Sequence, residues 1–178
     1  MGTAAVDFER VVEECRSGGL NDENVARLAK TVAETFQVRP QEVGILKVEG
    51  PWLVFLHPAK LRNLAAIPLN AANSVAAQTA SNSRPQIINN FAQVKHTTIF
   101  ESIQLDEKQE DRSTAVIQKL ISVPIPGPKG PLGVLQVCRK GATARAAGSD
   151  FSFLELQKLM SKASVLAKLL SAESTQAR

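Results

Sequence analysis

Two short apolar runs, separated by a cluster of prolines and glycines, constrain this chain more than any other feature. The runs are residues 120–125 and 132–137, and the cluster between them is residues 126–131 (PGPKGP). Both runs are rich in Val, Ile and Leu and too short for a typical buried helix, so the pattern predicts a β-hairpin. Pro131 can open the second strand but cannot lie in its middle, because proline has no N–H group to donate.

Periodic apolar residues predict helices near both ends of the chain. A first amphipathic helix is expected at about 4–16, and a second at about 22–38. Asn21 or Asp22 can cap the second helix by accepting hydrogen bonds from its first free N–H groups. Pro40 is expected to end it, because the residue before a proline disfavours helical geometry.

The last helix is expected at about 152–172. Ser152 and Glu155 fit an S-x-x-E capping box, in which each side chain satisfies a free backbone N–H group. The apolar stripe of this helix is wide, which predicts burial against both the sheet and a second subunit. A helix that covers a broad, twisted sheet is the alternative.

The middle of the chain contains shorter elements. Residues 43–49 and 52–57 read as two strands joined by a Gly-Pro turn, and His57 is expected to be an exposed residue at a strand end. Residues 61–69 fit either a short strand or a loop. An Ala-rich helix is expected within 70–83 and a short helix within 91–103, and the highly charged stretch 104–113 reads as a surface loop.

Composition excludes several classes of protein. The chain has 178 residues, which suggests one domain, and no apolar run approaches the length that spans a bilayer. The acidic N-terminus does not resemble a signal peptide, so a cytoplasmic location is expected. Residues 61–178 carry fourteen basic and eight acidic residues, which raises nucleic acid as a partner. The basic residues are scattered, however, and a solvated basic face is the preferred interpretation.

The cysteines and histidines give little support for a metal or redox site. Cys15 and Cys138 lie far apart and form no CxxC motif, so free thiols in a reducing compartment are expected. Cys15 continues an apolar helix face, which favours a packing role. The two histidines, His57 and His96, do not cluster with the cysteines at zinc-ligand spacings, so no metal is expected.

The hairpin and its flanks resemble the late strands of a GAF domain. The matching residues are 117–125 (IQKLISVPI), Gly130 and 132–137 (LGVLQV), in which Gly133-Val134 matches the family's Gly-Val pair. Phe151-Ser152 resembles the opening of the family's last helix, and residues 74–80 with Arg84-Pro85 resemble its middle helix and turn. This resemblance spans about residues 22–170.

The resemblance implies an α+β fold of the GAF/PAS-like kind. We expect an antiparallel sheet of five or six strands, with the terminal helices on one face and the middle helix and connectors on the other. Residues 1–20 would form a helix for packing or dimerisation, residues 21–172 the GAF-like domain, and residues 173–178 a frayed tail. The chain would be a stand-alone GAF-like protein.

GAF domains are mostly sensory or regulatory modules that bind small molecules and often pair through terminal helices. The sequence lacks the Asn-Lys-Phe-Asp-Glu signature of the cyclic-nucleotide type and the connector cysteine of the bilin type. The resemblance therefore implies a homodimeric, non-catalytic module that acts through an unknown small ligand, a signalling protein partner, or both. No membrane partner is expected, and nucleic acid is disfavoured.

The expected ligand-binding residues are polar residues in and around the connector: Asn89, Asn90, His96, Glu101, Ser122 and Gln136. Each of them alone also fits a plain structural role. One alternative function is a redox enzyme of the methionine sulfoxide reductase kind that uses Cys138, and another is a basic nucleic-acid-binding module. Strand alternation places Arg139 on the opposite face from Cys138, which weakens the enzyme hypothesis because a reactive thiolate needs a nearby cation.

Overall fold

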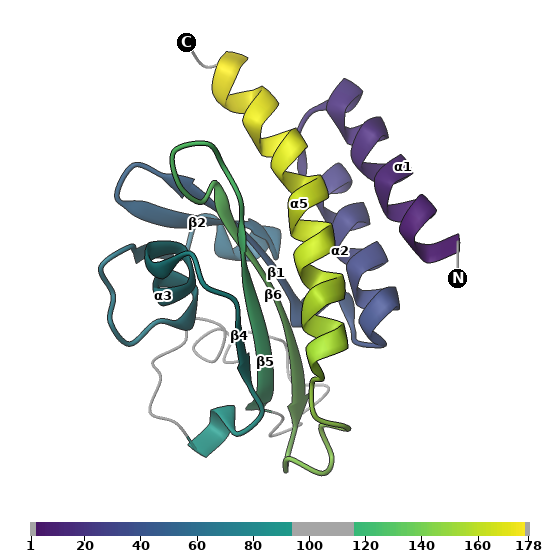
Figure 1. Cartoon of the computed structure of the whole chain (residues 1–178), viewed down its shortest axis with the longest axis vertical. Helices are drawn as coiled ribbons and strands as arrows, with labels where there is room; N and C mark the ends of the chain where they lie inside the picture. The colour runs from purple at the N-terminus through teal and green to yellow at the C-terminus, as the bar shows by residue number, and fades with distance from the viewer. Residues whose placement is uncertain (1–2, 94–115, 177–178) are drawn as a thin grey trace.

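A six-stranded antiparallel sheet forms the centre of the computed structural model, which describes residues 3–93 and 116–176 (Figure 1). The strand order is β3-β2-β1-β6-β5-β4. In this part of the chain, no helix is both long enough and apolar enough to cross a membrane. The helices are α1 (Thr3–Gly18), α2 (Asp22–Phe36), α3 (Val75–Asn82) and α5 (Phe153–Gln176), and the strands are β1 (Val43–Glu49), β2 (Trp52–His57), β3 (Ala66–Pro68), β4 (Gln86–Ile88), β5 (Val116–Ile125) and β6 (Gly133–Gly141).

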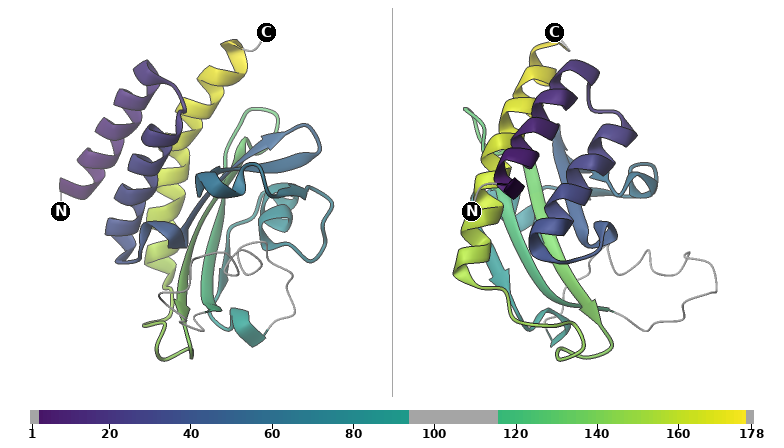
Figure 2. Two further views of the ribbon diagram at one scale, coloured as in Figure 1. Left: turned by 180° about the vertical axis from the view of Figure 1, so that it is seen from behind. Right: turned by 90° about the vertical axis from the view of Figure 1, so that its right-hand side faces the viewer.

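Helices cover both faces of this sheet. α2 packs on β1 and β2, and α5 packs on β4, β5 and β6, while α1 lies outside them against α2 and α5. α3 lies on the opposite face (Figures 1 and 2). Each face has its own cluster of buried apolar side chains, so the sheet separates two cores. The predicted arrangement of terminal and middle helices on opposite faces is confirmed.

The predicted hairpin is the longest pair of strands in the sheet. β5 and β6 pair from Val116↔Gly141 to Ile125↔Gly133. The N–H group of Leu132 donates to the carbonyl of Ile125 at 2.8 Å, which closes the turn. Pro131 lies in this turn rather than within β6, as expected for a residue with no N–H group.

Local signals fix the ends of the helices. The side chain of Asn21 caps α2 by accepting from the N–H group of Asn24 at 2.9 Å. At its other end, α2 stops because Gln37 adopts a left-handed conformation (φ 54°), three residues before Pro40. The capping box of α5 is present, since the N–H group of Ser152 donates to Glu155 at 2.8 Å. α5 continues to Gln176, beyond the predicted end at 172.

Other predicted elements differ in extent. Residues 61–69 contain the three-residue strand β3, and the predicted helix at 70–83 is confined to α3. Residues 91–93 form a single turn of 3-10 helix, while the rest of the segment 91–103 and the charged stretch 104–113 lie outside the described residues. His57 is half-buried rather than exposed, because its Nδ1 donates to the carbonyl of Val43 at 2.9 Å.

Replacing Gln37 with glycine is expected to stabilise the fold. A left-handed conformation strains any residue that has a Cβ atom, and glycine adopts it freely. We expect Gln37→Gly to raise the free energy of unfolding by roughly 0.5–1 kcal/mol, as measured by urea denaturation. Gln37→Ala is the matched control, because it removes the same side chain but keeps the Cβ. An equal gain in both variants would contradict this explanation.

Candidate functional site

A row of polar positions crosses the α3 face of the sheet within an otherwise apolar surface. Gln86 of β4 lies opposite Ser122 of β5, and Ser122 lies opposite Gln136 of β6. Gln136 in turn lies opposite Gly44 of β1. Directly opposed residues point to the same face, so the three side chains form one line. The row is bordered by buried apolar residues of the α3-side core: Leu46, Leu120, Val134 and Cys138.

Hydrogen bonds join this row to α3 in a fixed direction. The hydroxyl of Thr79 donates to the carbonyl of Val75 at 2.8 Å, which uses its single proton. Ser122 must therefore donate to Thr79 across their 2.8 Å contact. Ser122 accepts from Nε2 of Gln136 at 3.0 Å, and Thr79 accepts from Nε2 of Gln86 at 3.0 Å. The hydrogen bonds thus form a series in which Gln136 donates to Ser122 and Ser122 donates to Thr79 of α3.

At the other end of this series of hydrogen bonds lies the side-chain oxygen of Gln136, an open acceptor. Gln136 is only 3% exposed, and among the described residues nothing donates a hydrogen bond to its Oε1. A buried amide oxygen that lacks a donor costs about 1–3 kcal/mol. The neighbouring position across the strands is Gly44, which has no side chain to supply that donor. An N–H or O–H group that reached this buried position could donate to the oxygen of Gln136.

The structure brings together two of the predicted site residues, Ser122 and Gln136. Asn89 lies elsewhere and has a structural role: its amide donates to the carbonyl of Phe151 at 3.1 Å and accepts from the N–H group of Phe151 at 2.8 Å. Asn90 is exposed in the turn before residues 91–93. The two remaining predicted residues, His96 and Glu101, lie outside the described residues.

Thr79 and Gln86 belong to the network but were not predicted. Thr79 follows Val75 by four residues and is fully buried with it, so helical periodicity alone could have placed it on the inner face of α3. Gln86 gives no comparable signal, because its position depends on the pairing of β4 with β5.

Cys138 is a buried residue of the α3-side core. Burial raises the pKa of its thiol to about 12, so the neutral form dominates at physiological pH. Arg139 points to the other face, where its guanidinium lies 4.0 Å from the ring centre of Phe151 and 2.7 Å from Glu155, as strand alternation predicted. Cys15 is buried in the core on the helical face, and burial also raises the pKa of its thiol.

The described residues contain no group of His, Cys, Asp and Glu that could hold a metal ion. His57, the histidine among the described residues, ends β2, and its ring is hydrogen-bonded to the backbone carbonyl of Val43. Burial lowers the pKa of its imidazole, which favours the neutral ring. The polar row is therefore the candidate site that geometry supports on this face.

Solved structures with the same architecture are GAF-fold proteins. The GAF domain of a phosphoenolpyruvate-protein phosphotransferase from Acinetobacter matches at a TM-score of 0.69 and 12% identity, covering 99% of each chain. The corresponding domain from Coxiella burnetii matches at 0.67 and 11%, covering 97% of this chain and 95% of that chain. Free methionine-R-sulfoxide reductase from Neisseria meningitidis, solved with its substrate, matches at 0.60 and 19%, covering 100% and 96%.

No protein-family model matches the sequence, and no curated protein matches it. At these identities the structural matches show the fold alone. The chain has the GAF fold, as its hairpin suggested.

Breaking the network at its centre is expected to destabilise the protein. Ser122→Ala leaves the buried Nε2 of Gln136 without its acceptor, and we expect a loss of about 1–3 kcal/mol in the free energy of unfolding. Adding Gln136→Leu should recover part of that loss, because no buried amide then remains. Urea denaturation of the single and double variants measures both effects. Ser161→Ala, which removes an exposed hydroxyl on α5, is the control. Strictly additive effects of Ser122→Ala and Gln136→Leu would contradict the network.

The thiol of Cys138 is expected to be unreactive in the folded protein. With a pKa of about 12, its thiolate fraction at pH 8 is about one in ten thousand. A thiol count with an aromatic disulfide reagent should therefore be near zero for native protein and two after unfolding in guanidinium chloride. The variant Cys15→Ala isolates Cys138. Rapid labelling of Cys138 at pH 8 would overturn its assignment as a core residue.

Proposed function

We propose that this protein is a non-catalytic sensory or regulatory module that binds a small molecule on the α3 face of its sheet. The observation that carries the proposal is the open acceptor of Gln136 in a buried polar row. A ligand that presents an N–H or O–H group would satisfy this acceptor. The surrounding side chains, which include Leu46 and Val134, would contact its apolar part.

The hydrogen-bond chain gives such a ligand a route to influence α3. Ser122 and Thr79 connect the acceptor residue Gln136 to the backbone of α3 through the bonds described above. A ligand held at Gln136 would thus act on the same network that positions α3. This is the kind of coupling that a sensory module needs, because binding must favour one arrangement of the fold.

An enzyme of the methionine sulfoxide reductase kind is the alternative that the structural neighbours raise. Two neighbours with this activity have 19% and 16% identity, from Neisseria meningitidis and Thermoplasma acidophilum. Such chemistry here would depend on Cys138, since Cys15 lies in the other core. The burial and raised pKa of the Cys138 thiol count against that role, so we favour the non-catalytic module.

The outer face of α5 supports pairing of two copies of the chain. Three of the six large apolar side chains that are exposed in the described part lie on α5: Phe153, Leu154 and Met160. Phe153 and Met160 are seven residues apart and share one side of the helix with the small residue Ser164. A second copy of α5 would cover this side, and the proposal therefore includes a homodimer.

The side-chain amide of Gln136 provides a direct test of ligand binding. We expect a screen of small uncharged molecules with amide, amine or hydroxyl donors to yield one that shifts the Gln136 side-chain signal in a nitrogen–proton spectrum. The variant Gln136→Leu should assign that signal by its loss and weaken binding about tenfold. Gln118, a buried glutamine whose amide donates to the carbonyl of Gly141, is the internal control. Binding that is unaffected by Gln136→Leu would contradict the proposed site.

A further inference from the structure

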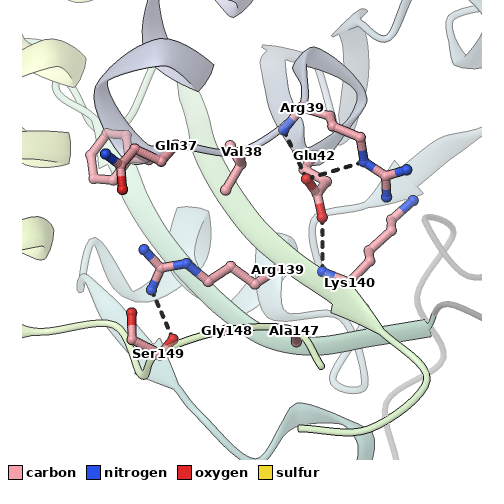
Figure 3. A pocket seen from close by; sticks show the side chains of 10 residues that line it. Gln37, Val38, Arg39, Glu42, Arg139, Lys140, Ala147, Gly148 and Ser149 are labelled. Atoms are coloured by element: carbon pink, nitrogen blue, oxygen red, sulfur yellow. Dashed lines mark hydrogen bonds and ion pairs between the residues drawn. The ribbon is translucent and has the colours of Figure 1, made fainter. Parts of the chain in front are cut away.

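A pocket that is separate from the polar row lies at one end of the sheet. It is a concave site lined by the end of α2 and the connector after it, the end of β6 and the loop that leads to α5, and its volume is about 400 Å³ (Figure 3). Lys140, which lines this pocket, lies four residues after Gln136 on β6. Its polar lining comes from Gln37, Arg39, Glu42, Arg139, Lys140 and Ser149.

Glu42 organises the wall of this pocket. It is only 6% exposed, and its two carboxylate oxygens accept from different backbone N–H groups. Oε2 accepts from the N–H group of Arg39 at 2.8 Å, and Oε1 accepts from the N–H group of Lys140 at 2.8 Å. One buried carboxylate therefore holds together two segments that are about a hundred residues apart in sequence. Both carry a cationic side chain (Figure 3).

Two other cations at this end of the sheet already have partners. The guanidinium of Arg139 donates to the carboxylate of Glu155 at 2.7 Å and to the carbonyl of Ser149 at 2.9 Å. The ammonium of Lys119, on the neighbouring strand, lies 2.8 Å from the carboxylate of Asp150. These interactions fasten the loop before α5 to the sheet, and they leave neither cation available to a ligand.

Arg39 and Lys140 differ from this pair. Among the described residues, the side chain of Arg39 makes one hydrogen bond or ion pair, which joins its Nε to Glu42 at 3.5 Å. Its two terminal nitrogens are therefore open, and its side chain is 62% exposed. The ammonium of Lys140 has no hydrogen-bond or ion-pair partner among residues 3–93 and 116–176. Arg39 and Lys140 are therefore the two cations of the lining that a ligand can reach, beside one carboxylate, that of Glu42, whose oxygens accept from backbone N–H groups. A concave site with this balance attracts anions.

We propose that this pocket binds a small molecule through a phosphate or carboxylate group, held between the guanidinium of Arg39 and the ammonium of Lys140. The planar fork of arginine donates two parallel hydrogen bonds to either group, and lysine adds a mobile point charge. A volume of about 400 Å³ lies within the range of small-molecule sites.

The occupant would connect two parts of the fold. Arg39 lies between α2 and β1, whereas Lys140 is the residue before the last one of β6, close to the loop that leads to α5. An anion bound to both would add a second link beside Glu42. This site does not depend on a ligand at Gln136, and either proposal can fail without the other.

The test is a titration of nitrogen-labelled protein with inorganic phosphate, and separately with acetate, at constant ionic strength kept by sodium chloride. Backbone amide signals of Arg39, Lys140 and Ser149 report binding at the pocket. We expect saturable shifts with a dissociation constant on the order of 1 mM for at least one of the two anions. The anion that saturates identifies the group that the pocket recognises.

Variants separate a specific site from general screening. Arg39→Ala and Lys140→Ala should each weaken binding about tenfold, while both keep the backbone N–H groups that hold Glu42. Lys168→Ala removes an exposed cation from α5 and should leave the affinity unchanged. Shifts that never saturate with either anion would overturn the proposal. So would saturable binding that survives both pocket variants, or that is lost equally in Lys168→Ala.

Discussion

Burial of β5 and β6 on both faces is the constraint on which the rest of this structure depends. Because side chains alternate along a strand, each of these strands must supply one set of residues to the helical core and another to the α3-side core. Ile121 and Val137 face the helices, while their neighbours Ser122 and Gln136 face α3. A shift of one residue in register would exchange the two sets. The hairpin turn therefore fixes both the core and the polar row.

The sequence predicted those parts of the fold that depend on residues close together in the chain. The prolines and glycines at 126–131 gave the hairpin, and the spacing of Ser152 and Glu155 gave the start of α5. The predicted end of α2 at about residue 38 was wrong, because the helix stops at Phe36 and Gln37 takes a left-handed conformation. That conformation favours glycine, so a glutamine at this position gives no signal of it. The GAF resemblance likewise rested on local patterns, which are the hairpin, Phe151-Ser152, and residues 74–80 with Arg84-Pro85.

The sites were less predictable, because they depend on contacts between distant segments. Ser122 and Gln136 were proposed with other polar residues in and around the connector, but the bond from Ser122 to Thr79 joins residues 43 apart. The link from Glu42 to Lys140 spans 98 residues. No spacing rule connects such pairs, since their proximity is set by the strand order of the sheet. The sequence therefore identified candidate site residues, whereas the sheet topology determines which of them lie close together.

The proposed function places ligand binding on one face of the sheet and pairing of subunits on the other, with β5 and β6 common to both. Native mass spectrometry of freshly purified protein tests this account most directly, because it reports subunit number and bound small molecules together. The account predicts a dimer that carries a noncovalent added mass, and loss of that mass, with the dimer retained, in Gln136→Leu. A bare monomer, or an added mass that is unchanged in Gln136→Leu, would contradict it.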